Sequence, residues 1–179
     1  MQLQKSLLTA TLLLAVSSLT VANAAPPAAI TTDQFKVLLQ VDSVCAIETG
    51  AAADINLGAI GAGEAQLVPG SVTGTTTITT RCSVGSSAII ALTPVSGNTD
   101  GTGVLLGGVA GAEKVKYQLT STAGLAGTAW GNTGANRVTT AAATNYATPI
   151  TTTVYATVTD TADVKPGAYE DTVTINITL

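Results

Sequence analysis

Strict alternation of apolar and polar residues is clearest in two segments of the chain. In the first segment the alternate apolar residues are Phe35, Val37, Leu39 and Val41. The residues between them are polar except Leu38. In the second segment the alternate apolar residues are Val173, Ile175, Ile177 and Leu179. A period of two places successive side chains on opposite faces of a strand. The pattern therefore predicts a half-buried β-strand in each segment.

Several shorter segments between these two are also rich in β-branched residues and are bounded by glycine or proline. They cover residues 54–57, 75–84, 87–93, 115–119, 138–142 and 151–158. No stretch shows a helical period of useful length, and strands at this density are typical of β-sandwiches. We predict an all-β, immunoglobulin-like β-sandwich, with Trp130 in its core.

The first residues have the pattern of an export signal. Lys5 supplies the positive charge, an apolar stretch runs to Val21, and Ala22-Asn23-Ala24 is a small-residue cleavage site. The stretch is too short and too rich in hydroxyls to span a membrane, and no other segment is a better candidate. We therefore predict a signal peptide over residues 1–24, a flexible leader over 25–34 and one domain over 35–179, with no membrane span in the mature chain.

Composition excludes most catalytic and binding classes. The chain has no histidine, which removes the usual general base and imidazole metal ligands. Seven basic residues become six when Lys5 leaves with the signal, against eleven acidic residues, so we expect no nucleic-acid partner. We predict that the protein is not an enzyme and binds no metal or cofactor.

Three segments carry carboxylate or other oxygen donors, but each has an ordinary structural interpretation. The pairs Asp160 with Asp163 and Glu170 with Asp171 lie in or beside predicted turns, where solvated carboxylates are the ordinary finding. Residues 98–103 are rich in oxygen donors, but they lack the ligand spacing of an EF-hand calcium loop. We expect a plain hairpin turn there.

Cys45 and Cys82 are the two cysteines of the chain. An oxidising compartment allows such a pair to form and persist as a disulfide, which is the pairing we predict for an exported protein. Two structural free thiols are the alternative.

The order of several motifs resembles the spore coat protein U domain family, which includes subunits of archaic chaperone-usher pili. The motifs are the alternating segment 35–41 running into Cys45, Ile55-Asn56-Leu57-Gly58, Thr80-Arg81-Cys82, Tyr117-Gln118-Leu119, Trp130-Gly131 and the segment 166–179 that begins Pro166-Gly167. Each motif is weak alone, but their order together with the paired cysteines and the signal peptide is specific.

The resemblance implies an immunoglobulin-like fold that lacks its last strand and leaves an apolar groove open. A periplasmic chaperone fills this groove during export. At an outer-membrane usher, a strand donated by the next identical or related subunit then replaces the chaperone. The implied function is a structural subunit of an adhesive pilus on the cell surface, used in attachment and biofilm formation. A secreted or coat-associated β-sandwich that binds a ligand without polymerising is the alternative.

Carried over to this sequence, the resemblance assigns a role to each alternating segment. The donor strand would be residues 35–41, with Phe35, Val37, Leu39 and Val41 facing the groove of a neighbour. Alternatively, this segment is the domain's own first strand and the donor lies upstream, around Ala28 and Ile30. The edge of the receiving groove, and the contact with the chaperone, would be Val173, Ile175, Ile177 and Leu179.

Overall fold

The structure is a computed structural model that describes residues 32–48, 52–62, 70–96, 98–108 and 112–179. The chain divides into two units between Leu39 and Gln40, and each is described by itself. The described part of the first unit, residues 32–39, has no helix or strand. The predicted signal peptide, most of the predicted leader and the alternative donor around Ala28 and Ile30 lie outside the described residues.

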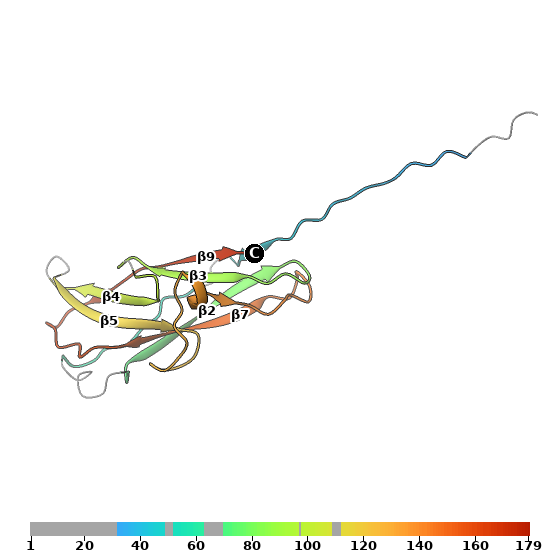
Figure 1. The fold of residues 1–179 in the computed structure, drawn as a ribbon. Coiled ribbons are helices and arrows are strands. Elements are labelled where there is room, and N and C mark those ends of the chain that lie inside the picture. Colours follow the sequence, from blue (N-terminus) through green and yellow to red (C-terminus); the bar gives the residue numbers. More distant parts are fainter. Residues whose placement is uncertain (1–31, 49–51, 63–69, 97, 109–111) are drawn as a thin grey trace, which may run out of the picture. The chain divides into compact units, whose positions relative to one another are not determined.

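The second unit is a sandwich of two antiparallel β-sheets (Figure 1). Its strands are β1 (Cys45–Ile47), β2 (Thr73–Cys82), β3 (Ile89–Pro94), β4 (Thr102–Gly107), β5 (Glu113–Thr120), β6 (Val138–Thr139), β7 (Ile150–Val158), β8 (Tyr169–Glu170) and β9 (Val173–Thr178). One sheet has the order β1-β2-β7-β5-β4-β8, and the other has the order β6-β3-β9. The all-β, immunoglobulin-like prediction is confirmed. Within the described part of the chain, no helix has the length and hydropathy needed to cross a membrane.

The smaller sheet shows how alternation in the sequence becomes a core face. In β3 the buried positions are Ile90, Leu92 and Pro94, and their partners in β9 are Ile177, Ile175 and Val173. The intervening residues of β9 are exposed. Each apolar residue of β9 therefore lies beside a buried residue of β3, as the period of two requires.

The core between the sheets is closed around Trp130, which is completely buried. Its indole Nε1 donates a hydrogen bond of 3.0 Å to the carbonyl oxygen of Ile90. Ile78 of β2, Leu119 of β5 and Val154 of β7 belong to the same buried cluster. A buried indole with its N–H satisfied is a packing residue, which agrees with the predicted core role.

Several segments differ from the predicted elements, among them the short strands β1 and β8, which were not predicted. Residues 54–57 form no strand, although Ile55 and Leu57 still pack against the core. β4 was not predicted, because its glycines resemble turn residues. Segment 35–41 forms no strand, so its predicted half-burial is not found within the chain itself.

Candidate functional site

A groove opens between the two sheets beside the beginning of β9. Its volume is about 910 Å³. The inner faces of both sheets supply an apolar lining that includes Leu92, Leu105, Leu119, Val154, Val158, Val173 and Ile175. Residues 164–172, which lead into β9, form part of its rim. Leu92, Leu119, Val154 and Val158 are nevertheless at most 3% exposed, so the groove does not leave these side chains open to solvent.

β9 is the edge strand that borders this groove. It pairs with β3 on one side, and no strand among the described residues pairs with its other side. An unpaired apolar edge carries a row of backbone N–H and C=O groups ready to bind another strand. The geometry of β9 can therefore accept an added strand.

The four residues predicted for the groove edge are placed differently from one another. Val173 and Ile175 line the groove. Ile177 packs against the buried core cluster but is not part of the groove lining. Leu179 follows the end of β9 and is 57% exposed. The structure thus brings the first two together at the groove and leaves the last at the surface.

Residues 52–60 form the opposite wall of the groove without strand pairing. Thr76 Oγ1 donates a hydrogen bond of 2.7 Å to the carbonyl oxygen of Ala53. Ile55 packs so closely over Gly74 that a Cβ on this glycine would lie 2.7 Å from Ile55 Cγ2. The absence of a side chain at Gly74 therefore lets this wall lie close to β2.

A polar network crosses the sandwich at the groove. Tyr117 Oη and Ser96 Oγ each donate a hydrogen bond of 2.9 Å to Oδ2 of Asp171. Ser96 Oγ in turn accepts a bond of 3.0 Å from the backbone N–H of Val104. Burial, and then the carboxylate of Asp171, raise the pKa of Tyr117 above its ordinary value. The network holds Asp171, two residues before β9, against β5.

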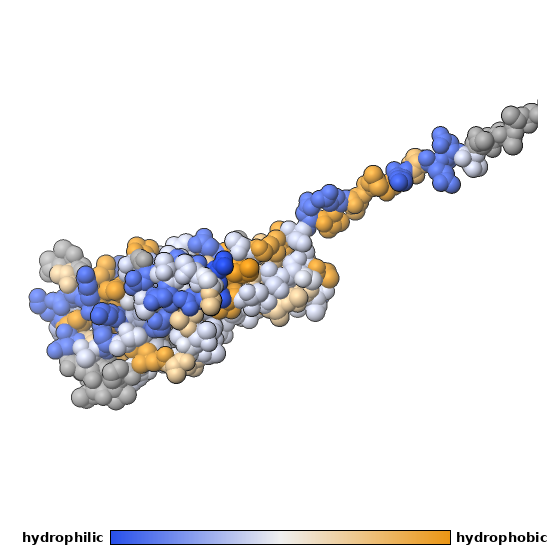
Figure 2. All heavy atoms as spheres, viewed as in Figure 1, coloured by the Kyte–Doolittle hydropathy of each residue, from blue (hydrophilic) through white to orange (hydrophobic). Residues whose placement is uncertain are grey.

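The predicted donor residues are among the most exposed apolar side chains in the structure. Their exposed fractions range from 81% at Val41 to 89% at Phe35. Leu38, which has the opposite parity, is 84% exposed. Figure 2 shows apolar and polar residues interleaved along the segment that precedes β1. The apolar side chains of this segment are therefore exposed on both of its faces.

The predicted disulfide is present and joins two neighbouring strands of one sheet. Cys45 begins β1, Cys82 ends β2, and the two are register partners. On one side of this bond, Val44 and Ser83 are hydrogen-bonded to each other. On the other side, Arg81 Nη2 lies 2.8 Å from Oε1 of Glu48. The first strand is therefore fixed to β2 along its whole length.

Two of the acidic residues discussed above, Asp160 and Asp100, accept hydrogen bonds from other residues of the chain. Asp160 Oδ2 accepts a hydrogen bond from the backbone N–H of Lys116. Asp100 Oδ1 accepts bonds from the side chain and backbone of Thr102, which hold the pKa of Asp100 below its ordinary value. The expected hairpin turn is not found: residues 98–101 connect β3 and β4, which belong to different sheets, and residues 102–103 already belong to β4. The described residues contain no group of three or more potential metal ligands.

The sequence did not reveal the floor of the groove or the network around Asp171. The floor comes from strands far apart in the chain, and each of its residues was predicted only as general core. In the sequence Asp171 stands beside Glu170, but its hydrogen-bond partners in the structure are Tyr117 and Ser96. The spacing of these residues along the chain carries no signal of their contact.

Comparison with solved structures supports the fold. A crystal structure of the CsuC-CsuE chaperone-tip adhesion subunit pre-assembly complex, from archaic chaperone-usher Csu pili of Acinetobacter baumannii, matches with a TM-score of 0.51 and 22% identity. The match covers 78% of this chain and 40% of that chain. A chaperone-tip adhesin complex of CFA/I fimbriae matches with a TM-score of 0.40 and 17% identity, over 74% of this chain and 42% of that chain. This chain thus spans well under two thirds of either chain.

No curated protein matches the sequence. A family model does: the Spore Coat Protein U domain matches residues 31–176. This range includes the exposed alternating segment, both cysteines, the groove and residues 173–176 of β9. The chain therefore belongs to the Spore Coat Protein U domain family, as the motifs in its sequence indicated.

Proposed function

We propose that this protein is a structural subunit of an archaic chaperone-usher pilus that polymerises by donor-strand exchange. The observation that carries the proposal is a pair of complementary features in one chain. A groove opens beside the unpaired edge of β9, and residues 35–41 form an exposed apolar row without a strand of their own. Insertion of this row into the groove of a second copy would bury the apolar row and fill the groove beside β9.

The energetics favour such an insertion. Burying four large apolar side chains contributes about 6 to 12 kcal/mol, at about 1.5 to 3 kcal/mol each, before the cost of ordering the segment. Backbone hydrogen bonds to the edge of β9 would add register and orientation. In strand addition, specificity comes from pockets that are filled by every second side chain of the added strand. The alternating row has its large apolar side chains at such positions.

The same groove explains the partners in the proposal. An exposed apolar edge strand is an aggregation hazard, so the subunit needs a periplasmic chaperone until the usher joins it to its neighbour. The Csu complex that shares this fold is itself a chaperone bound to a pilus subunit. The disulfide agrees with export through an oxidising compartment. The finished fibre would lie on the cell surface and serve attachment and biofilm formation.

The parity of the donor segment provides the test. Val37→Asp and Leu39→Asp should abolish SDS-resistant polymers when the chain is expressed with its chaperone and usher, because each places a charge in an apolar pocket. Leu38→Asp is the matched control, since its side chain has the opposite parity and should tolerate the charge. A complex with the chaperone should form in all three variants.

Two outcomes would contradict the proposal. Polymers that survive Val37→Asp and Leu39→Asp would exclude residues 35–41 as the donor. A wild-type chain that remains a stable, cooperatively folded monomer without a chaperone would favour a lone secreted or coat-associated binding module.

A further inference from the structure

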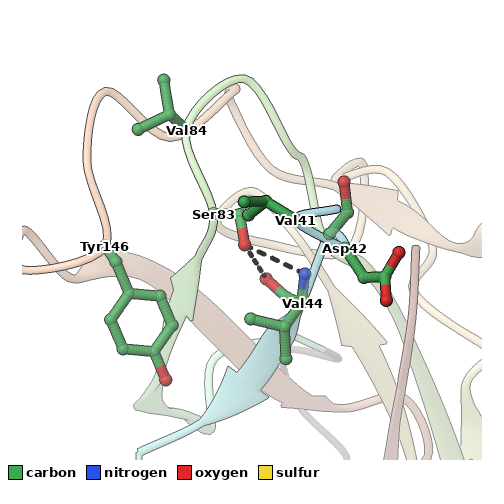
Figure 3. A pocket seen from close by; sticks show the side chains of 7 residues that line it. Val41, Asp42, Val44, Ser83, Val84 and Tyr146 are labelled. Atoms are coloured by element: carbon green, nitrogen blue, oxygen red, sulfur yellow. Dashed lines mark hydrogen bonds between the residues drawn. The ribbon is translucent and has the colours of Figure 1, made fainter. Parts of the chain in front are cut away.

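A second apolar surface lies where the chain enters the sandwich. It is a shallow hollow of about 570 Å³, lined by Val41, Asp42, Ser43, Val44, Ser83, Val84 and Tyr146. Figure 3 shows that Tyr146 comes from a different loop from the turn that carries Ser83 and Val84. Val84 is 72% exposed, Tyr146 is 48% exposed and Val44 is 47% exposed. We call this surface the entry hollow.

The entry hollow is attached to the proposed donor row by a short length of chain. Val41 is the last residue of that row and also part of the hollow. Val44 is held in place by Ser83, whose backbone N–H donates a bond of 2.8 Å to the Val44 carbonyl and whose Oγ accepts one of 3.0 Å from the Val44 N–H. Three residues span about 10 Å at most. Any groove that takes up Val41 must therefore lie within about 10 Å of Val44.

The sandwich has two distinct ends. At the entry end β1 begins, β2 ends and β9 ends, because Cys45 pairs with Cys82 and Thr178 pairs with Ile89 at the start of β3. At the mouth end β9 begins and β3 ends, because Val173 pairs with Pro94. The groove is lined by the first half of β9, on the side of the mouth end.

The direction of a donated strand decides at which end of the accepting subunit the donating subunit lies. A donor parallel to β9 would leave the groove at the entry end, where the accepting subunit already has its own entry hollow. An antiparallel donor would leave at the mouth end, so that each subunit receives one neighbour at each end. β3 already pairs with β9 in the antiparallel sense. The antiparallel arrangement places the entry hollow of the donating subunit over the mouth end of the accepting subunit.

We propose that the entry hollow is a second contact between successive copies of this chain, made with the mouth end of the subunit that accepts the donor strand. This inference rests on the proposed function. The mouth end offers matching apolar surface. Val95, whose N–H donates to the carbonyl of Thr172 just before β9, is 70% exposed, and Ile60 on the groove lining is also exposed.

A photo-cross-linking amino acid in place of Val84 tests the contact in polymers assembled from the full chain with its chaperone and usher. We expect cross-links to peptides of a second copy that contain Val95, residues 52–62 or residues 164–172. In the same background, Tyr146→Ser should lower the cross-linking yield by about tenfold, because the aromatic surface is lost. Tyr146→Phe is the control and should retain the yield.

The outcomes separate this inference from the proposed function. SDS-resistant polymers without cross-links between copies, or with cross-links to the chaperone alone, would overturn the second contact and leave strand exchange standing. Cross-links to residues 177–179 of the neighbour would overturn the antiparallel arrangement. Failure of the wild-type chain to polymerise at all would overturn the proposed function and this inference with it.

Discussion

The hydroxyl of Tyr117 donates a 2.9 Å hydrogen bond to Oδ2 of Asp171 and so connects the two sheets at the groove. Tyr117 belongs to β5 in the larger sheet, and Asp171 stands two residues before β9 in the smaller one. Here a charge-assisted hydrogen bond holds the beginning of the edge strand in place while the groove beside it stays open.

Tyr117→Phe should destabilise the fold, by about 1.5 to 3 kcal/mol, because a hydrogen bond to a charged acceptor is lost. The free energy of unfolding in guanidinium measures this effect, here and for the variants below, on the chain with its groove filled by a peptide of residues 33–42. Asp171→Ala should cost more, since it leaves the hydroxyls of Tyr117 and Ser96 without their acceptor. Equal stability of wild type and Tyr117→Phe would show that the bond does not hold the edge strand.

The burial of Tyr117, together with the same bond, should make the protein sensitive to alkaline pH. The pKa of Tyr117 is raised in the folded state above its ordinary value of 10.0. Below that pH both states keep the proton and the stabilisation is constant. Above it the unfolded chain releases the proton first, so stability falls by up to about 1.4 kcal/mol per pH unit. The difference between wild type and Tyr117→Phe should therefore shrink above pH 10, and a constant difference up to pH 11.5 would contradict the assignment.

Gly103→Ala should destabilise the sandwich, because the added Cβ would overlap the ring of Tyr117. Overpacking of this kind typically costs about 1 to 3 kcal/mol. Gly167→Ala is the matched control, since nothing lies within 4 Å of a Cβ at that position. Thermal unfolding of the two variants compares them directly, and similar losses would point to a general sensitivity of glycine positions.

Replacing Cys45 and Cys82 together by serine should lower the free energy of unfolding by about 4 kcal/mol, the entropic value for a loop closed over a sequence separation of 37. Guanidinium unfolding of the double variant and of the reduced wild type should agree, because both lack the same constraint. A loss below about 1 kcal/mol would indicate that the hydrogen bonds of β1 already hold the strand.

An added peptide of residues 33–42 should shorten the polymers, because it occupies the groove and ends chain growth. A peptide of the same length with aspartate in place of Val37 and Leu39 is the control and should have no effect. Ladders on SDS gels of unheated samples report the length distribution. Equal effects of the two peptides would show that the inhibition does not depend on the apolar row.

The sequence alone predicts the strands in which apolar and polar residues alternate along a single segment. β2, β3, β5, β7 and β9 overlap the predicted strands, since alternation of β-branched residues reflects burial on one face of a sheet. β4 was missed because Gly103 and Gly107 break that pattern. Glycine is needed at these two positions because the rings of Tyr117 and Tyr169 occupy the space that side chains there would fill.

The groove and the donor segment show a different limit. Segment 35–41 has the pattern of a half-buried strand, yet no surface within the described chain buries it. Alternation indicates that a segment is suited to burial, but it does not say in which molecule. The lining of the groove depends on which strands become neighbours in the two sheets. That information is absent from the period of any single segment.

The disulfide has a mechanical consequence for a fibre built in the proposed way. Tension transmitted through the donor segment enters each subunit at Val44 and reaches Cys45 next. The covalent bond passes the load directly to Cys82, at the end of a strand that is paired with β7 over most of its length. The residues between the two cysteines are therefore shielded from stretching, and the short strand β1 cannot be peeled away one hydrogen bond at a time. The extensible part of each subunit would be the chain outside this covalent loop.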